Sequence, residues 1–293
     1  MNNSSSSIYW GLILGGSSGI GLASVKKLAA EGFNVCVVYR ERRSGAAKAE
    51  EEFDKLRAGG ANIISFNADA LSDAGREKIL DDLLIELEKD NSKIRLMLHS
   101  VARGNLKLLA PNVDQSGIIK KSLEDLGIDT TSLELPEVMD DSRLLNQEDY
   151  RLTIHAMGSS LLDWANSVRE REMFANDARI IGLTSEGNKK AWKAYGAISA
   201  AKVVLEAMAR SMAVELAPFG IRTNIIQAGV TNTPSLRMIP GSTDIIKHSV
   251  IRNPFHRLTT PEDVANVVYL LSTDEASWIN GSIINVDGGE QIA

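Results

Sequence analysis

The sequence has one cysteine, few histidines and no excess of basic residues, and each scarcity excludes a class of protein. Because Cys36 has no second cysteine to pair with, an intrachain disulfide is impossible, and its apolar neighbours predict a buried, inert thiol. The formal net charge of -6 argues against a nucleic-acid partner, since phosphate binding requires a basic face. We expect no metal site, because neither metal-ligand spacing nor a carboxylate cluster accompanies the four histidines, His99, His155, His248 and His256.

The sequence also lacks an apolar run long enough to cross a membrane. The apolar stretch Ile8–Leu14 is too short for that purpose and continues directly into glycines, so we interpret it as a first β-strand. The preceding segment, Met1–Ser7, lacks the basic region of a signal peptide and is predicted to be a short disordered tail. With no targeting signal and no membrane partner, the expected location is the cytoplasm.

What is present is an ordinary globular composition arranged in a regular alternation. The 293 residues, 44% of them hydrophobic and 24% charged, suffice for a substantial core. Short β-branched apolar runs alternate with helical patterns, which is typical of βαβ units and a parallel sheet. The predicted strands are Ile8–Leu14, Asn34–Tyr39, Asn62–Phe66, Arg95–His99, Arg179–Leu183, Arg222–Ile226 and Ser282–Val286. The predicted helices are Ile20–Ala30, Gly45–Arg57, Asp73–Lys89, Asp149–Glu170, Tyr195–Ala217 and Pro261–Leu271.

This alternation predicts an α/β fold of the Rossmann type, with a doubly wound parallel sheet in a single domain over residues 1–293. One segment, residues 105–147, departs from the alternation. It is polar, carries Pro111 and Pro136, and has only a weak helical patch near Ile118–Leu126. A long insertion after the fourth strand borders the ligand crevice of such sheets, so it is either a lid or partner-binding element or a family-specific decoration.

A glycine-rich loop joins the first predicted strand to the first helix. Gly15 permits a tight turn, Gly19 lets backbone N–H groups approach a pyrophosphate, and Gly21 allows the helix to pack closely on the strand. The helix N-terminus adds the positive end of its dipole. The loop therefore predicts a dinucleotide site formed by Gly15, Ser17, Ser18, Gly19, Ile20 and Gly21.

The end of the second strand favours NADPH over NADH. A carboxylate there would bind the adenosine 2′-hydroxyl, whereas cations would hold a 2′-phosphate. Arg40 stands in this place, with Arg42 or Arg43 as reinforcement; the alternative is a solvated basic face partly neutralised by Glu41. Further candidate cofactor contacts follow the third and fourth strands. They are Asp69 and Ala70 at the adenine ring, and Ser100, Val101 and Ala102 at the nicotinamide side.

Three motifs together resemble the short-chain dehydrogenases and reductases. They are the glycine loop, a late helix opening with a tyrosine and a lysine, and the terminal Val286-Asp287-Gly288-Gly289. The usual lysine position, four residues after Tyr195, holds Ser199, and the lysine is Lys202, seven residues after the tyrosine. A step of seven still places both residues on one helix face, with a rise of about 10 Å.

The Tyr-x6-Lys spacing resembles the enoyl-[acyl-carrier-protein] reductases. The segments Tyr39–Ser44 and His99–Ala102, and His155 in place of a helix asparagine, are similar to members of that family. Two features differ from many members: the glycine loop is closer to that of ketoreductases, and Ser185 replaces a second tyrosine ten residues before Tyr195. A subgroup of the family combines such a loop with Tyr-x6-Lys.

The resemblance implies a mechanism. Hydride passes to the β-carbon of an enoyl thioester, Tyr195 hydrogen-bonds to the developing enolate, and Lys202 holds the nicotinamide ribose. Ser185 is an auxiliary hydroxyl or a simple strand-end serine. After the sixth strand, Gly229, Val230, Thr231 and Thr233 resemble the segment that closes over the nicotinamide, although the two threonines also suit plain turn chemistry. Apolar Leu236, Met238 and Ile239 are lid candidates over an acyl chain or packing residues, and Trp192 is a pocket wall or a packing residue.

Three functions remain open at this point. The leading hypothesis is an NADPH-dependent enoyl-thioester reductase of fatty-acid synthesis, whose substrate is carried on acyl carrier protein or coenzyme A. The second is a carbonyl reductase, for example of 3-oxoacyl thioesters, against which Ser199 argues. The third is a non-catalytic NADP-binding sensor or subunit, against which the pair of Tyr195 and Lys202 argues. By resemblance we expect a homodimer or homotetramer assembled through the helices Asp149–Glu170 and Tyr195–Ala217.

Overall fold

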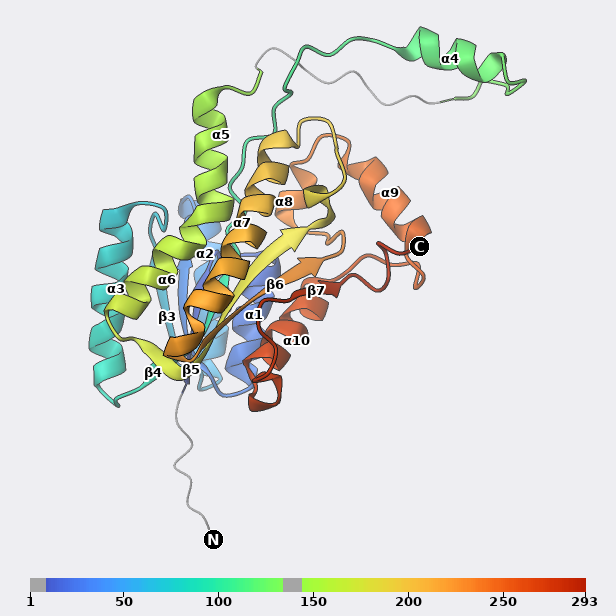
Figure 1. The fold of residues 1–293 in the computed structure, drawn as a ribbon. Coiled ribbons are helices and arrows are strands. Elements are labelled where there is room, and N and C mark those ends of the chain that lie inside the picture. The colour runs from blue at the N-terminus through green and yellow to red at the C-terminus, as the bar shows by residue number, and fades with distance from the viewer. Residues whose placement is uncertain (1–8, 134–143) are drawn as a thin grey trace.

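Seven parallel strands form one sheet in the order β3-β2-β1-β4-β5-β6-β7 (Figure 1). The computed structural model describes residues 9–133 and 144–293. The strands are β1 Tyr9–Leu14, β2 Asn34–Tyr39, β3 Ile63–Asn67, β4 Lys93–His99, β5 Phe174–Ser185, β6 Ile221–Ala228 and β7 Ile283–Val286. The predicted Rossmann-type doubly wound sheet is thus confirmed. Ile8, predicted to open the first strand, lies outside the described residues, as does the tail Met1–Ser7.

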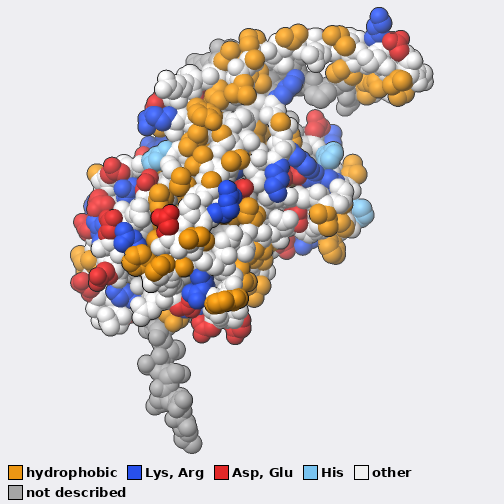
Figure 2. Space-filling model, viewed as in Figure 1, with side chains coloured by type: hydrophobic (Ala, Val, Ile, Leu, Met, Phe, Trp, Pro, Cys, Tyr) orange, Lys and Arg blue, Asp and Glu red, His pale blue; other side chains and the backbone are white. Residues whose placement is uncertain are grey.

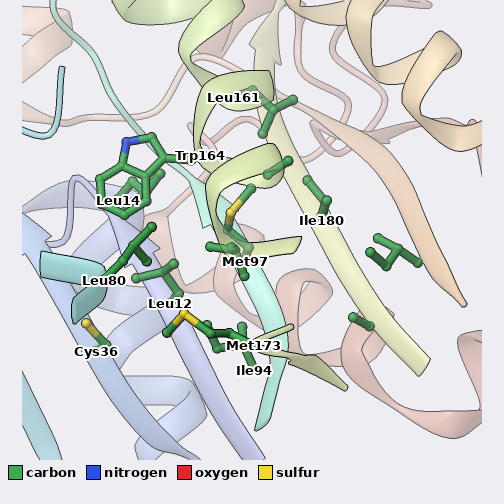
Figure 3. Close-up of a cluster of buried hydrophobic side chains, with 14 of the residues drawn as sticks. Leu12, Leu14, Cys36, Leu80, Ile94, Met97, Leu161, Trp164, Met173 and Ile180 are labelled. Atoms are coloured by element: carbon green, nitrogen blue, oxygen red, sulfur yellow. The ribbon is translucent and has the colours of Figure 1, made fainter. Parts of the chain in front are cut away.

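Helices cover both faces of the sheet. On one face α3 (Asp73–Glu88), α6 (Ser160–Glu170) and α7 (Gly196–Glu215) bury a core with β1, β4 and β5. Figure 3 shows this core, in which Cys36 lies among packed apolar side chains such as Leu12 and Leu80. On the other face lie α1 (Gly19–Ala30), α2 (Arg43–Ala58) and α10 (Pro261–Ser272). The Cys36 thiol is buried, as predicted, and burial raises its pKa.

Three strands, β4, β5 and β6, begin earlier than predicted. β5 begins at Phe174 instead of Arg179, and β4 begins at Lys93 instead of Arg95. The Asp177 carboxylate accepts from Arg95 at 2.8 Å and from Arg179 at 2.6 Å, and it also pairs with Arg222 at the start of β6. Asp177, which looks like a loop residue in the sequence, therefore lies within β5, where three arginines neutralise its charge.

The predicted helix Asp149–Glu170 is interrupted. It consists of α5 (Gln147–Ile154), a π-helical turn at His155–Ser159, and α6. α5 begins two residues earlier than predicted because Asn146 and Asp149 form a capping box. A second correction is that α9 (Ser242–Arg252), together with short α8 (Pro234–Arg237), occupies a region for which no helix was predicted.

The insertion leaves the body as a projecting arm that carries α4 (Ser116–Glu124) (Figure 1). Its base is fastened to α5: Leu145 N donates to Leu108 O at 2.8 Å, and Lys107 pairs with Asp149 at 2.6 Å. No residue of α4 is buried. Pro136 lies outside the described residues. Across residues 9–133 and 144–293, no helix is long and apolar enough to cross a membrane.

Candidate active site

The sheet order reverses between β1 and β4, and the glycine loop lies at this switch point. Gly15 has a φ of +89°, and a Cβ there would overlap the carbonyl group of Ser100, which follows β4. A Cβ on Gly21 would overlap the carbonyl oxygen of Gly15. The loop thus requires glycine at both positions, as the sequence predicts, and it borders the crevice where open α/β sheets bind ligands.

The first turn of α1 keeps its backbone donors free of a side-chain cap. Ser18 is the N-cap residue, and its hydroxyl makes no capping hydrogen bond. Ser17 instead donates to the Glu41 carboxylate at 3.0 Å, and Ile20 packs into the core beneath the loop. Uncapped N–H groups at a helix N-terminus suit a pyrophosphate, so the residues present fit a dinucleotide.

The predicted adenosine residues form an ion-paired cluster. Arg40 Nη1 lies 2.7 Å from Asp69 Oδ2, and Arg103 Nη1 lies 3.9 Å from the same oxygen. Asp69 also accepts from Leu71 N at 3.0 Å. Two guanidinium groups beside one carboxylate leave a net positive charge here, and Arg103 was not among the predicted residues. Arg42 and Arg43 begin α2 with exposed side chains.

The segments after β3 and β4 lie beside this crevice. Ala70 O accepts the Trp164 indole N–H at 2.8 Å, which fixes the segment at Asp69 and Ala70 to α6. Ser100 N donates to Leu14 O at 2.8 Å, and Val101 packs against the core. Ala102, which follows them, is exposed.

Tyr195 and Ser185 meet at the end of β5. Their hydroxyl oxygens are 3.5 Å apart, and the tyrosine is only 7% exposed. Burial raises the Tyr195 pKa, and the contact with Ser185 opposes this effect only in part. Tyr195 is therefore a neutral hydrogen-bond donor near pH 7. It is the N-cap residue of α7 and not its first turn, which corrects the predicted helix start.

Lys202 lies inside α7 and is 8% exposed. Its ammonium donates to Leu183 O at 2.7 Å. Burial lowers its pKa to about 8, while the Glu206 carboxylate opposes the shift. Within the described residues no hydrogen bond joins Lys202 to Tyr195: the lysine contacts Leu183 O and the tyrosine contacts Ser185.

The loop after β6 faces the glycine loop. The Thr233 methyl group would lie 3.1 Å from a Cβ on Gly19. Its hydroxyl accepts from Leu236 N at 3.3 Å, and Thr231 donates to Gly229 O at 2.9 Å. Both threonine hydroxyls therefore make the turn hydrogen bonds that were considered as the alternative. Val230, between Gly229 and Thr231, donates its N–H to the Glu290 carboxylate at 3.1 Å.

A cavity of about 350 Å³ opens beside Tyr195. One wall is the base of the arm at residues 108–112, and the other is the segment at residues 191–196 with Ser199. Trp192 packs edge-on against the Tyr195 ring at 5.4 Å, and Ile239 joins the same apolar cluster. Of the other lid candidates, Leu236 is buried and Met238 is exposed.

The chain is similar to known proteins over most of its length. The enoyl-(acyl carrier protein) reductase model matches residues 136–291, and the short chain dehydrogenase model matches residues 10–107. This chain is a short-chain dehydrogenase/reductase. It belongs to the part of that superfamily described by the enoyl-(acyl carrier protein) reductase model, as the Tyr-x6-Lys spacing predicts, and it is an oxidoreductase.

Individual relatives support the same assignment. The 1-cyclohexenylcarbonyl-CoA reductase of Streptomyces collinus is 26% identical over 283 residues, which cover 96% of this chain and 86% of the relative. The enoyl-[acyl-carrier-protein] reductase [NADH] FabI of Synechocystis sp. is 36% identical over 122 residues, 42% of this chain and 47% of that one. The crystal structure of enoyl-[acyl-carrier-protein] reductase (NADH) from Aquifex aeolicus VF5 shares the fold at a TM-score of 0.73 and 21% identity, covering 97% of each chain.

In this dehydrogenase/reductase, the sequence analysis did not identify Glu206, a buried acid that lies close to Lys202. Glu206 is one helical turn after Lys202, and its carboxylate accepts from Thr184 at 2.6 Å and from Asn188 at 2.5 Å. The i,i+4 spacing from Lys202 was the available signal. The negative charge of this carboxylate favours the protonated form of Lys202.

Two of the four histidines make side-chain hydrogen bonds next to the π-helical turn and α6. Burial lowers the pKa of His99 to about 3, and its Nε2 lies 2.8 Å from Ser160 Oγ. Because Ser160 donates to Ala156 O, the His99 Nε2 atom is the donor in this pair. His155 pairs with Asp163 at 3.1 Å at the π-helical turn. No group of three or more His, Cys, Asp or Glu residues in the described part of the chain is arranged to hold a metal.

Proposed function

We propose that this short-chain dehydrogenase/reductase reduces the carbon–carbon double bond of a trans-2-enoyl thioester. The observation that carries the proposal is the placement of the lysine. Lys202 is buried two turns into α7, whereas Ser199, at the position of a ketoreductase lysine, lines the cavity beside Tyr195. A hydroxyl group at that position cannot supply a cation.

The residues divide the chemistry between them. A nicotinamide cofactor, when bound, would supply the hydride for the new C–H bond at the β-carbon, and the electrons of the double bond would move toward the thioester carbonyl. Tyr195, kept neutral by burial, donates a hydrogen bond to the oxygen on which negative charge develops. Ser185, 3.5 Å from that hydroxyl, supports its orientation, and a proton from solvent completes the product at the α-carbon.

The cavity suits an acyl chain. Its walls include Leu108, Leu109 and Pro111 from the arm, and Trp192 from the segment before Tyr195. A volume of about 350 Å³ lies at the small end of ligand pockets. The similarity to a coenzyme A thioester reductase and to acyl-carrier-protein reductases supports a thioester as the group that reaches Tyr195.

We propose NADPH as the preferred cofactor. Two relatives carry NADH in their names, whereas this chain places the guanidinium groups of Arg40 and Arg103 around Asp69. A 2′-phosphate would accept charge-assisted hydrogen bonds from these guanidinium groups in place of Asp69. The carboxylate of Glu41, which would prefer a 2′-hydroxyl, is directed instead to Ser17.

We also propose a homodimer or homotetramer. Exposed apolar side chains include Tyr150 and Leu152 on α5 and Val203 on α7, and Figure 2 shows hydrophobic side chains over this region and along the arm. Unpartnered apolar patches of this kind favour self-association. Light scattering after size-exclusion chromatography measures the assembly, and a monomeric mass at micromolar concentration would contradict it.

The test of the function follows oxidation of NADPH and NADH with crotonyl-coenzyme A and, separately, acetoacetyl-coenzyme A. We expect turnover of the enoyl thioester, preference for NADPH, and loss of turnover in Tyr195→Phe. Turnover of the ketone alone would replace the proposal by a carbonyl reductase. Failure of both substrates, with intact cofactor binding, would favour the non-catalytic subunit.

A further inference from the structure

Three segments, namely the end of β5, the end of α9 and the chain after β7, converge on Arg252, whose side chain is 12% exposed. Arg252 is the last residue of α9, and its Nη2 atom lies 2.9 Å from both carboxylate oxygens of Glu186 and 2.7 Å from Glu290 Oε1. Glu186 directly follows Ser185, and Glu290 follows β7 near the end of the chain. Lys190 also pairs with Glu186 at 2.9 Å. Two carboxylates and two cations thus balance one another.

Glu290 holds the backbone after β6. It is 1% exposed, and its second oxygen accepts the Val230 N–H at 3.1 Å. A Cβ on Gly229 would lie 2.8 Å from the same carboxylate oxygen, so the main chain at residue 229 is pressed against Glu290. The position of this strand end therefore depends on a carboxylate 60 residues away in the sequence.

We propose that Glu290 and Arg252 are positioning residues for the nicotinamide end of the cofactor. Their ion pairs fix the backbone at Gly229 and Val230 relative to Glu186, and hence relative to Ser185, which precedes Glu186 in the sequence. This inference rests on the cofactor use proposed above. A buried ion pair adds little to the free energy of unfolding because its charges lose their hydration, but it can hold its groups in one arrangement. A displacement of about 1 Å in a reacting group lowers the rate roughly 100-fold.

The test compares Glu290→Gln with a variant of another arginine-rich cluster. Asp177→Asn weakens the pairing with Arg95 and Arg179 near the start of β5, at the opposite end of that strand from Ser185. We expect both variants to lower Tm. We expect only Glu290→Gln to raise the Kd for NADPH, by roughly 10- to 100-fold, in a fluorescence titration without substrate.

Kinetics separate positioning from general destabilisation. In Glu290→Gln the KM for the cofactor should rise while the KM for crotonyl-coenzyme A stays near that of the wild type. Arg252→Lys keeps a cation, but the lysine side chain is one bond shorter than the path to Nη2, the atom that contacts both carboxylates. It should therefore weaken cofactor binding in the same direction. It serves as the second variant if Glu290→Gln does not fold.

The outcomes are distinguishable. Unchanged NADPH affinity in folded Glu290→Gln or Arg252→Lys, or an equal loss of affinity in Asp177→Asn, overturns the positioning role while leaving the proposed function intact. If the wild-type protein binds neither NADPH nor NADH, the proposed function and this inference both fail. If the wild type prefers NADH, the same comparison is made with NADH.

Discussion

The hydroxyl groups of Ser185 and Tyr195 lie 3.5 Å apart at the end of β5, with the tyrosine buried and neutral. This pairing gives Tyr195 a neighbour that can orient its proton toward a ligand.

Removing the serine hydroxyl should reduce catalysis without abolishing it. Ser185→Ala should lower kcat with enoyl thioester by about 10-fold, since one neutral hydrogen bond is lost, whereas Tyr195→Phe should lower it by about 100-fold or more. Steady-state kinetics with crotonyl-coenzyme A measure both. Ser272→Ala, at a buried serine in α10, is the matched control, and an equal effect of both alanine variants would argue against a special role of Ser185.

Activity should fall as the pH rises through about 8. The Lys202 pKa is lowered to about 8, so its ammonium is lost there, while the raised pKa of Tyr195 keeps that hydroxyl protonated over the same range. The pH profile of kcat/KM for the cofactor should show this alkaline limb. Lys202→Arg keeps its charge to high pH, so any activity that it retains should lack the limb. An unchanged limb in that variant would assign it to another group.

Lys202→Met should abolish activity and stabilise the fold. Because the lysine pKa falls from 10.5 to about 8 on folding, burying the cation costs up to about 3 kcal/mol below pH 8. Between pH 8 and 10.5 the unfolded chain binds more protons, so wild-type stability rises with pH and this cost disappears. Denaturant unfolding should therefore show a stability gain of the variant near pH 7 that shrinks toward pH 10.5.

Arg40→Gln should weaken selection for NADPH. Loss of a charged hydrogen-bond donor to the 2′-phosphate should lower kcat/KM for NADPH by about 10- to 100-fold. NADH, which lacks that phosphate, is the internal control and should be affected little. Equal losses with both cofactors would show that Arg40 supports the site only through its pair with Asp69.

Gly21→Ala should abolish dinucleotide binding. The added Cβ would overlap the Gly15 carbonyl oxygen, so α1 and the glycine loop cannot both keep their places. Gly117→Ala is the control, because a Cβ on Gly117 in α4 meets open space. Calorimetric titration with NADPH should show no binding for the first variant and ordinary binding for the second. Wild-type affinity in Gly21→Ala would contradict the assigned packing.

Ala110→Trp should shift the acyl-chain preference. A large side chain at the arm wall of the cavity should lower kcat/KM for dodecenoyl-coenzyme A by at least about 10-fold, because several buried methylene groups lose contact. Crotonyl-coenzyme A should be affected little. Leu126→Trp, at an exposed position just after α4, is the matched control. If both variants leave the chain-length profile unchanged, the acyl chain lies elsewhere.

Local sequence patterns predicted most strands of the sheet and the glycine loop of the proposed cofactor site. Gly15 and Gly21 follow a buried strand at fixed spacing, and the structure gives both the crowded backbone positions that only glycine tolerates. The same local reasoning missed Glu206, Arg103 and Arg252, because their roles depend on residues distant in the sequence or on helix packing. It also placed a continuous helix across His155, where a π-helical turn occurs.

The sequence by itself determined the α/β class, the glycine loop, and the tyrosine and lysine seven residues apart, because each depends on spacing along one strand, turn or helix. Only the tertiary structure decided which groups these residues meet. It paired Arg40 with Asp69, directed Glu41 to Ser17, and placed Glu290 beneath Val230. Such pairings arise when strands from distant parts of the chain end at one edge of a sheet, and no local pattern specifies which side chains then lie within hydrogen-bond distance.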